Sequence, residues 1–304
     1  MPRVARIKFV NAIYHIMVRS ISEVILFKDS EDKNRYLMLL KKYQKIFHFK
    51  IYAYCLMSNH GHIAMDCCGA DISKIMKAIN QSYVAYFNSK YNRHGHLFQD
   101  RFKSKVIDTN GYLITLSAYI HNNPRDIDEF KTNIENYQYS SLGIYLGIAN
   151  DAFGLLNTDY VLSHFSSNKT TGRKSYLDLI NRLSNTCEKI DIEFLNDGSE
   201  CRNERKILIR DFTVQNIITF ISKYTETPFN IHIKYNHRNS ELRSLCVLIM
   251  RGLCNYDSKK ICQVIGNITE SSIGRLCNKA YYLITKNTKY YTLIDDLISE
   301  HSVI

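Results

Sequence analysis

Several features that would assign the chain to a well-defined class are missing from its sequence. None of the nine cysteines forms a C-x-x-C pair, the spacing typical of zinc ribbons and thiol redox sites. Several cysteines lie in apolar runs, as Cys246 does within Leu245–Met250. We therefore expect reduced, buried thiols rather than a disulfide framework.

Long apolar segments are missing as well. No run approaches the roughly 18 residues needed to cross a membrane, and Met1–Arg6 lacks the apolar core of a signal peptide. No G-x-x-x-x-G-K-[ST] run is present, so no nucleotide cofactor is expected. We expect a cytoplasmic protein with no membrane partner.

Charge is abundant and unevenly distributed. Residues 1–150 carry 20 Lys and Arg against 12 Asp and Glu, residues 151–200 carry 5 against 8, and residues 201–304 carry 15 against 9. Two basic blocks therefore flank an acidic stretch, which indicates two surfaces that face polyanions. The alternative is a generally basic protein without such surfaces.

The length of 304 residues suffices for two domains.

The first half of the chain alternates strand and helix patterns. We expect strands at 13–19, 51–57, 60–65 and 102–107, with a turn at Ser58-Asn59. We expect helices that begin at Asp29 or Ser30, at Asp71, and at Thr109 or Asn110, the last ending near Pro124. This order predicts an α+β fold, an antiparallel sheet with helices packed on it.

The second half is predicted to be helical. Residues 148–206 have weak periodicity and are interpreted as a helical connector and linker. Helices are expected at 213–224, 241–253, 258–265 and from about Glu270, with a break at Pro228 and a turn at Gly266-Asn267. The last elements resemble a helix-turn-helix. The expected domains are thus 1–147, the connector 148–206, and an all-α domain over 207–304.

His60-Gly61-His62 is a candidate metal site. Residues two apart on a strand point to the same side, so both imidazoles could reach one cation. The preceding strand is apolar on both sides, which indicates that the histidines lie inside a sheet, where they need partners. A pair of polar surface histidines is the alternative.

Tyr119 and Asn123 form a second candidate pair at the end of the third helix. Four residues apart, they lie one above the other on one side of a helix. A tyrosine hydroxyl is a poor nucleophile at its usual pKa of about 10 unless a nearby metal and a base assist it. The carbonyl oxygen of Asn123 suits a hard cation. Most of the 22 tyrosines must serve packing, so Tyr119 alone would not stand out.

Between these motifs, cations alternate with aromatic residues over 91–104. Such a mixture neutralises phosphates while it stacks bases, so the segment is expected to bind single-stranded DNA. A solvated loop is the alternative. The candidate contacts are Arg93, His96, Arg101 and Lys103.

These motifs together resemble a known family. Tyr52–His62 is similar to the hallmark of the REP-associated tyrosine transposases, relatives of the single-strand insertion-sequence transposases of the HUH superfamily. Gly95–Ser104, Tyr119–Pro124, and Tyr137–Ser141 with Tyr145–Gly147 resemble its further motifs, in the same order. The resemblance implies a ferredoxin-like sheet, the HUH nuclease fold, with Mg²⁺ or Mn²⁺ at His60, His62 and Asn123 and with Tyr119 as nucleophile. Its implied substrate is a DNA hairpin.

The sequence departs from that family at two positions. Gly61 stands where a bulky hydrophobic residue is usual, which predicts a weaker strand and an unfilled core position. Ser58 stands where many members have proline. Neither change removes a chemical group from the site.

A second resemblance covers about residues 211–285, which are similar to the duplex-binding domain of the replication initiator DnaA. It rests on Arg238-Asn239-Ser240, Arg243, Ile265-Gly266-Asn267 and Thr269–Ile273. By position, the major groove would be contacted from the last helix and phosphates by two arginines. An ordinary helical bundle is the alternative. The candidates are Ser271, Ser272, Arg275 and Lys279 for the groove, and Arg238 and Arg243 for phosphates.

The sequence thus predicts a metal-dependent nuclease and strand transferase, a transposase-like enzyme of the cytoplasm and nucleoid. It would act on single-stranded hairpin DNA through a 5′-phosphotyrosine and hold duplex DNA through its C-terminal domain. Two alternatives stay open: a DNA-binding regulator on a degenerate HUH fold, for which Gly61 is the sole support, and a phosphodiesterase that uses water.

Overall fold

A computed structural model describes residues 12–185, 208–233 and 237–301. Packing divides the chain into two units. The first comprises residues 1–44, 49–68 and 72–205, and the second comprises the remainder. Each unit is described by itself.

The first unit is built on a four-stranded antiparallel sheet. Its strands are β1 (Ile13–Arg19), β2 (Lys50–Leu56), β3 (His60–Asp66) and β4 (Lys103–Ile107), in the order β2-β3-β1-β4. This is the predicted ferredoxin-like arrangement, with strand bounds within one residue of those expected. β3 pairs on both sides, so its histidines lie inside the sheet, as the sequence predicts.

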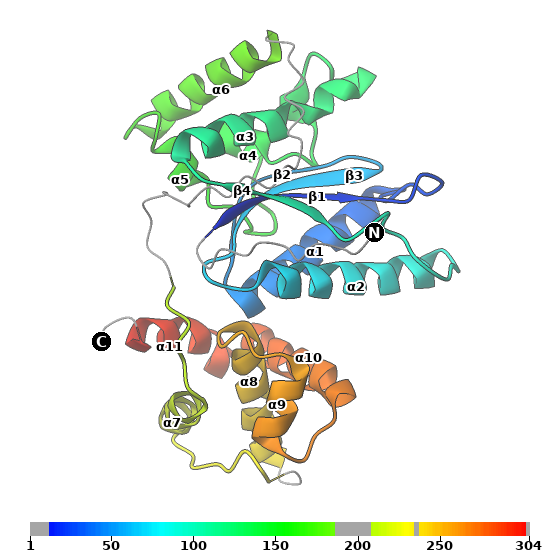
Figure 1. The fold of residues 1–304 in the computed structure, drawn as a ribbon. Helices are drawn as coiled ribbons and strands as arrows, with labels where there is room; N and C mark the ends of the chain where they lie inside the picture. The colour runs from blue at the N-terminus through cyan, green and yellow to red at the C-terminus, as the bar shows by residue number, and fades with distance from the viewer. Residues whose placement is uncertain (1–11, 186–207, 234–236, 302–304) are drawn as a thin grey trace. The chain divides into compact units, whose positions relative to one another are not determined.

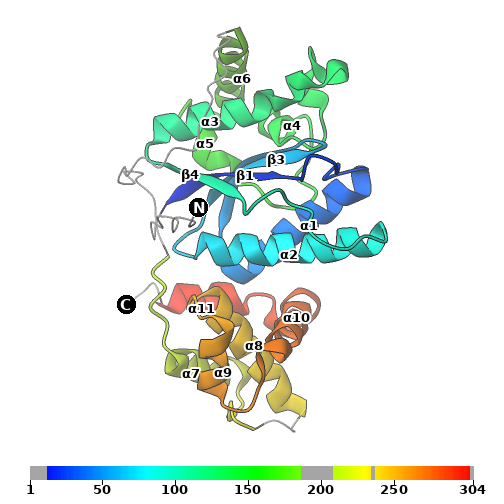
Figure 2. The same cartoon turned by 45° about the vertical axis from the view of Figure 1, so that its right-hand side comes forward.

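Helices cover both faces of the sheet. α1 (Ser30–Phe47) and α2 (Ile72–Lys90) lie along one face, and α3 (Asn110–Asn122) lies along the other (Figures 1 and 2). The hydroxyl of Thr109 accepts a hydrogen bond from the backbone N–H of Tyr112 at 3.1 Å and caps α3, as predicted. Pro124 follows α3 within the short 3-10 turn Asn123–Asp126, and further 3-10 turns span Asp128–Phe130 and Ile134–Asn136.

Gly61 does not leave the unfilled core position that the sequence predicts. A methyl group added at Gly61 would meet Leu56 Cδ2 at 3.0 Å and Val18 Cγ2 at 3.4 Å. The side chains of the two neighbouring strands thus already occupy this space, and β3 runs unbroken from His60 to Asp66. The expectation was wrong because the sequence alone does not show which neighbours close over a glycine.

The motif Tyr137–Ser141 covers the outer edge of β2. The backbone N–H of Leu56 donates to the carbonyl of Tyr139, and that of Tyr54 donates to Ser141 Oγ. The Tyr137 hydroxyl donates to the Leu56 carbonyl at 2.6 Å. The motif therefore pairs an edge that would otherwise be open, and the short helix α4 (Leu142–Leu146) follows it.

The residues interpreted as a connector contribute α5 (Thr158–Leu162) and α6 (Lys169–Asn185), and α6 packs on α3 and α4. The hydroxyl of buried Tyr176 lies 2.9 Å from Ser117 Oγ and 2.7 Å from His121 Nδ1. The described part of 148–206 therefore belongs to the first unit rather than to a free linker. Residues 186–206 lie outside the described ranges.

The second unit is helical, as predicted. Its helices are α7 (Val214–Thr225), α8 (His237–Gly252), α9 (Ser258–Ile265), α10 (Glu270–Lys286) and α11 (Leu293–His301), with a 3-10 turn at Thr288–Tyr290. α9 ends at Gly266, whose φ of 79° suits glycine, so α9 and α10 are joined by a tight turn. In the part of the chain that is described, no helix is long and apolar enough to cross a membrane.

Candidate functional site

The structure brings His60, His62, Tyr119 and Asn123 together between the sheet and α3. On β3, the ring centroids of His60 and His62 lie 5.1 Å apart, edge to face. The ring of Tyr119 on α3 lies 5.8 Å from that of His62. Asn123, one helical turn after Tyr119, is hydrogen-bonded through its side chain to His60. The two residues of β3 thus meet Tyr119 of α3 and Asn123 just after it. The spacing predicts each pair separately, and the family resemblance implies that the pairs meet.

A third histidine, which the sequence analysis missed, lies in the same place. His15 is 1% exposed on β1, and its Nε2 lies 3.0 Å from Nδ1 of His62. Its ring is stacked on His62 at 5.2 Å and faces the edge of Tyr119 at 6.2 Å. The available signal was a histidine in the middle of an apolar strand, since a buried polar side chain needs a partner.

The hydrogen bonds around these side chains leave a consistent set of atoms for a cation. Nδ1 of His62 is engaged by His15, and Nδ1 of His60 lies 2.6 Å from Asn59 Oδ1. Nε2 is therefore the nitrogen of each ring that could bind a cation, and in His60 this is the nitrogen that faces Asn123. The amide nitrogen of Asn123 donates to the carbonyls of Tyr119 and Ile120, at 2.9 and 3.3 Å. Its oxygen is therefore the atom directed at His60.

This donor set fits a divalent cation that accepts both nitrogen and oxygen. Among the described residues, no three His, Cys, Asp or Glu side chains form a metal-binding group. The set here has an amide as its third member. Two imidazole nitrogens and one amide oxygen are donor types that such a cation accepts.

The surroundings keep the histidines neutral. Burial lowers the pKa of His62, and the neighbouring His15 and His60 lower it further. Burial also lowers the pKa of His60, although its bond to Asn123 acts in the opposite direction. Burial, with nearby Lys105, lowers the pKa of His15 to about 3. Neutral imidazole is the form that binds metals, so these rings are ready to act as ligands near pH 7.

Two cations flank the site on the same side of the sheet. Arg19 is paired with His60 across β1 and β3, and Lys105 is paired with His15 across β1 and β4. Lys105 Nζ lies 5.4 Å from the ring centroid of Tyr112 on α3. A bound phosphodiester would therefore have positive charge on either side, which favours its binding. Neither residue was among the candidates from the sequence.

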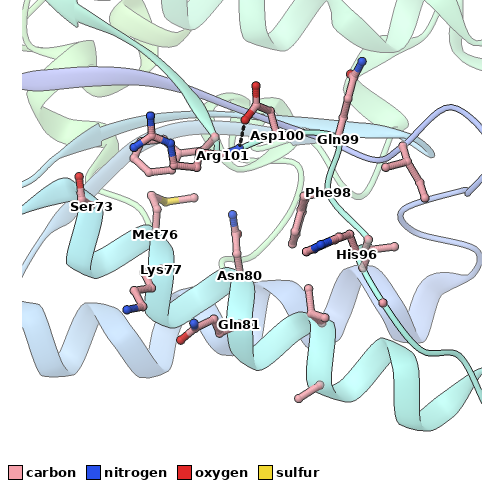
Figure 3. A pocket seen from close by; sticks show the side chains of 16 residues that line it. Ser73, Met76, Lys77, Asn80, Gln81, His96, Phe98, Gln99, Asp100 and Arg101 are labelled. Atoms are coloured by element: carbon pink, nitrogen blue, oxygen red, sulfur yellow. Dashed lines mark hydrogen bonds between the residues drawn. The ribbon is translucent and has the colours of Figure 1, made fainter. Parts of the chain in front are cut away.

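The expected single-strand contacts separate into two groups. His96 and Arg101 line a hollow of about 840 Å³ between α2 and the loop before β4 (Figure 3). Arg93 lies outside this hollow and is half-buried, with its guanidinium 3.5 Å from the carbonyl of His96. Lys103 is exposed on β4, opposite Met17 of β1.

The expected duplex contacts also differ in their environments. Ser272, Arg275, Lys279 and Arg243 line a second hollow, of about 550 Å³, within the second unit, and Ser271 is exposed nearby. Arg243 is only 3% exposed and donates to the Asn267 side chain, so it holds the turn between α9 and α10. The side chain of Arg238 lies outside the described part.

Comparison with known proteins finds a similarity that lies within the first unit. Residues 8–123 match the family described as "Transposase IS200 like". A solved structure of the REP-associated tyrosine transposase bound to a REP hairpin is similar over 52% of this chain and 90% of its own, with 16% identity and a TM-score of 0.43. No curated protein matches the sequence.

Proposed function

We propose that this protein is a metal-dependent enzyme that cuts and rejoins single-stranded DNA, and the match of residues 8–123 to the IS200-like transposase family supports the proposal. The observation that carries the proposal is the meeting of His60, His62, Tyr119 and Asn123 in one place. The protein would thus be a transposase whose chemistry depends on one tyrosine.

Tyr119 is the proposed nucleophile. Its hydroxyl oxygen attacks the scissile phosphorus and loses its proton to solvent, while the bond from phosphorus to the 3′ oxygen breaks. The 3′ oxygen takes up a proton and leaves as a free hydroxyl, and the 5′ phosphate stays bound to the tyrosine. The reverse reaction with another 3′ hydroxyl rejoins the strand. Because the covalent bond conserves the energy of the phosphodiester, no nucleotide cofactor is needed.

His60, His62 and Asn123 would hold the cation, Mg²⁺ or Mn²⁺. When bound, it would polarise the scissile phosphate and offset the charge that builds up during attack. His15 would fix the orientation of His62, and Arg19 and Lys105 would attract the DNA backbone. The orientation of the Asn123 amide and the neutral state of the histidines support this assignment.

The proposed substrate is a hairpin with adjacent unpaired bases. This rests on the resemblance of four spaced motifs to the REP-associated transposases, together with the basic and aromatic segment Arg93–Lys103. The second unit would hold duplex DNA. Its net positive charge and the hollow lined by Arg275 and Lys279 support that role.

Trapping a covalent adduct tests the proposal directly. Labelled single-stranded hairpin DNA incubated with the protein and Mn²⁺ should give a product that withstands denaturant and migrates with the protein. A water-using phosphodiesterase would cut without an adduct, and a non-catalytic regulator would bind without cutting. Leu56 and Val18 fill the space beside Gly61, which supports the catalytic proposal over the regulator alternative.

A further inference from the structure

The hollow between α2 and the loop 95–102 lies on the face of the sheet opposite Tyr119. Its volume, about 840 Å³, falls within the range of small-molecule sites, roughly 300–1,000 Å³. Figure 3 shows Met76 and Asn80 rising from α2, with Phe98 on the loop beside them and Arg101 on the far wall. The proposed chemistry at Tyr119 does not use this hollow.

The wall formed by the loop is fixed to the end of β1. The backbone N–H of Gln99 donates to the carbonyl of Arg19 at 3.0 Å, and that of Ile21 donates to the carbonyl of Leu97 at 3.1 Å. Arg19 is also the partner of His60 across the sheet. A DNA strand that passes the end of β1 could therefore reach both the hollow and the candidate active site.

Asn80 presents a hydrogen-bond donor to the hollow. The hydroxyl of buried Tyr36 donates to Asn80 Oδ1 at 3.2 Å, which fixes the orientation of the amide. The amide nitrogen is consequently directed away from Tyr36, and in Figure 3 it points into the hollow. Lys77 and Arg101, both exposed, add further donors on the lining.

We propose that this hollow binds one unpaired nucleobase of the single-stranded DNA, with guanine preferred. Phe98 supplies an aromatic surface for stacking, and half-buried Val84 of α2 supplies apolar surface on the same lining. Guanine carries two neighbouring acceptors, O6 and N7, on one edge, and that edge matches the donors of Asn80, Lys77 and Arg101 on the lining. Adenine presents an amino donor there, so it should bind less well. Since the ligand is DNA, the inference rests on the proposed function and adds a specificity site to it.

The test measures binding without cleavage. The full chain with Tyr119→Phe is titrated in EDTA against fluorescent oligothymidylates that carry one central guanine, adenine, cytosine or abasic residue. Guanine should bind roughly tenfold more tightly than the abasic strand. Asn80→Asp keeps the acceptor for Tyr36 but replaces the donor with an acceptor, so the preference for guanine should disappear. Phe98→Leu keeps the bulk and removes the stacking surface, so it should weaken all strands that carry a base.

Asn150→Ala, an exposed amide of the same unit away from the hollow, is the matched control and should keep the preference. Equal affinity for guanine and abasic strands, or an unchanged preference in Asn80→Asp, would overturn the proposal. Either result would leave the covalent adduct at Tyr119 unaffected. Conversely, if no covalent adduct formed, the binding preference for guanine could still be measured, so the two proposals fail separately.

Discussion

Nε2 of His15 lies 3.0 Å from Nδ1 of His62, and the two rings are stacked. A histidine that binds a metal through one nitrogen commonly has its other nitrogen held by a neighbour, which sets the tautomer and the ring orientation. Here the neighbour is another buried histidine on the adjacent strand. We therefore propose that His15 positions His62 and is not itself a ligand of the cation.

His15→Phe should weaken Mn²⁺ binding by roughly 10- to 100-fold, because the ring stack survives but the hydrogen bond to His62 is lost. Calorimetric titration of the DNA-free protein with Mn²⁺ measures this without any cleavage assay. Tyr119→Phe, which changes the other ring beside His62, is the control and should bind Mn²⁺ as the wild type does. Unchanged affinity in His15→Phe would remove His15 from the site.

Chelation should abolish cleavage, and Mn²⁺ should restore it at lower concentration than Mg²⁺. Two imidazole nitrogens and one carbonyl oxygen favour Mn²⁺, because Mg²⁺ prefers oxygen ligands alone. His60→Ala and His62→Ala should each eliminate cleavage at any concentration of either ion. The measurement is the rate of hairpin cutting in EDTA followed by metal titration, and full activity in EDTA would exclude the metal site.

Tyr119→Phe should remove covalent adduct formation and cleavage while hairpin affinity changes less than about twofold, since the change removes one oxygen and keeps the ring. Tyr112→Phe, on the same helix, is the matched control and should retain the adduct. Adduct formed by Tyr119→Phe would identify another nucleophile.

Local signals sufficed for the elements that carry this site. The strand-like runs on either side of Ser58-Asn59 predict the hairpin that holds His60 and His62, and Thr109 predicts the start of the helix that carries Tyr119. The spacing between these residues then places them on one strand and one helix. Each of these signals lies within a few residues of the structure that it specifies.

What depends on pairing between distant segments could not be predicted. The sequence shows a histidine at position 15 but not that β1 pairs with β3 in the register that brings it to His62. Likewise, nothing near Tyr176 shows that its hydroxyl reaches His121, so the sequence alone predicts a connector and linker over 148–206. The donor at Asn80 depends on Tyr36 of another helix.

Acid should destabilise the first unit well before its carboxylates titrate. Burial lowers the pKa of His121 to about 3, and that of His15, with Lys105 nearby, to about 3, whereas both titrate near 6.5 in the unfolded chain. Below pH 6.5 the unfolded state therefore binds protons that the folded state does not. For each histidine, the free energy of unfolding falls by about 1.4 kcal/mol for every pH unit of acidification between those two pKa values.

Urea unfolding at pH 7, 6 and 5 without metal measures how the free energy of unfolding changes with pH. His121→Gln should reduce the slope by about that amount, and an unchanged slope would contradict the assignment.

In the second unit, Arg275 and Arg243 should give opposite results although both line the same hollow. Arg275 is exposed on α10, so Arg275→Ala should cost roughly 1–3 kcal/mol of sequence preference for duplex DNA while the domain stays folded. Arg243 is buried and holds the Asn267 turn, so Arg243→Ala should lower the unfolding temperature and weaken binding to all sequences alike. Gel retardation at several salt concentrations, alongside thermal unfolding, separates the two effects.

The same variants distinguish a tether from a lid. If the second unit only holds duplex DNA, Arg275→Ala should cut a free single-stranded hairpin at the wild-type rate. If the second unit instead covers the catalytic unit, a variant that loosens this cover should cut the hairpin faster.

A truncation makes the comparison sharper, but it must retain α6, because Tyr176 of α6 bonds to Ser117 and His121 of α3. A chain ending after Asn185 should therefore cut the hairpin as fast as the full chain and lose duplex binding. A chain ending at Gly147 should unfold at a lower temperature, because α3 then has no α6 to pack against. If the chain ending after Asn185 cut the hairpin faster than the full chain, the lid would be favoured.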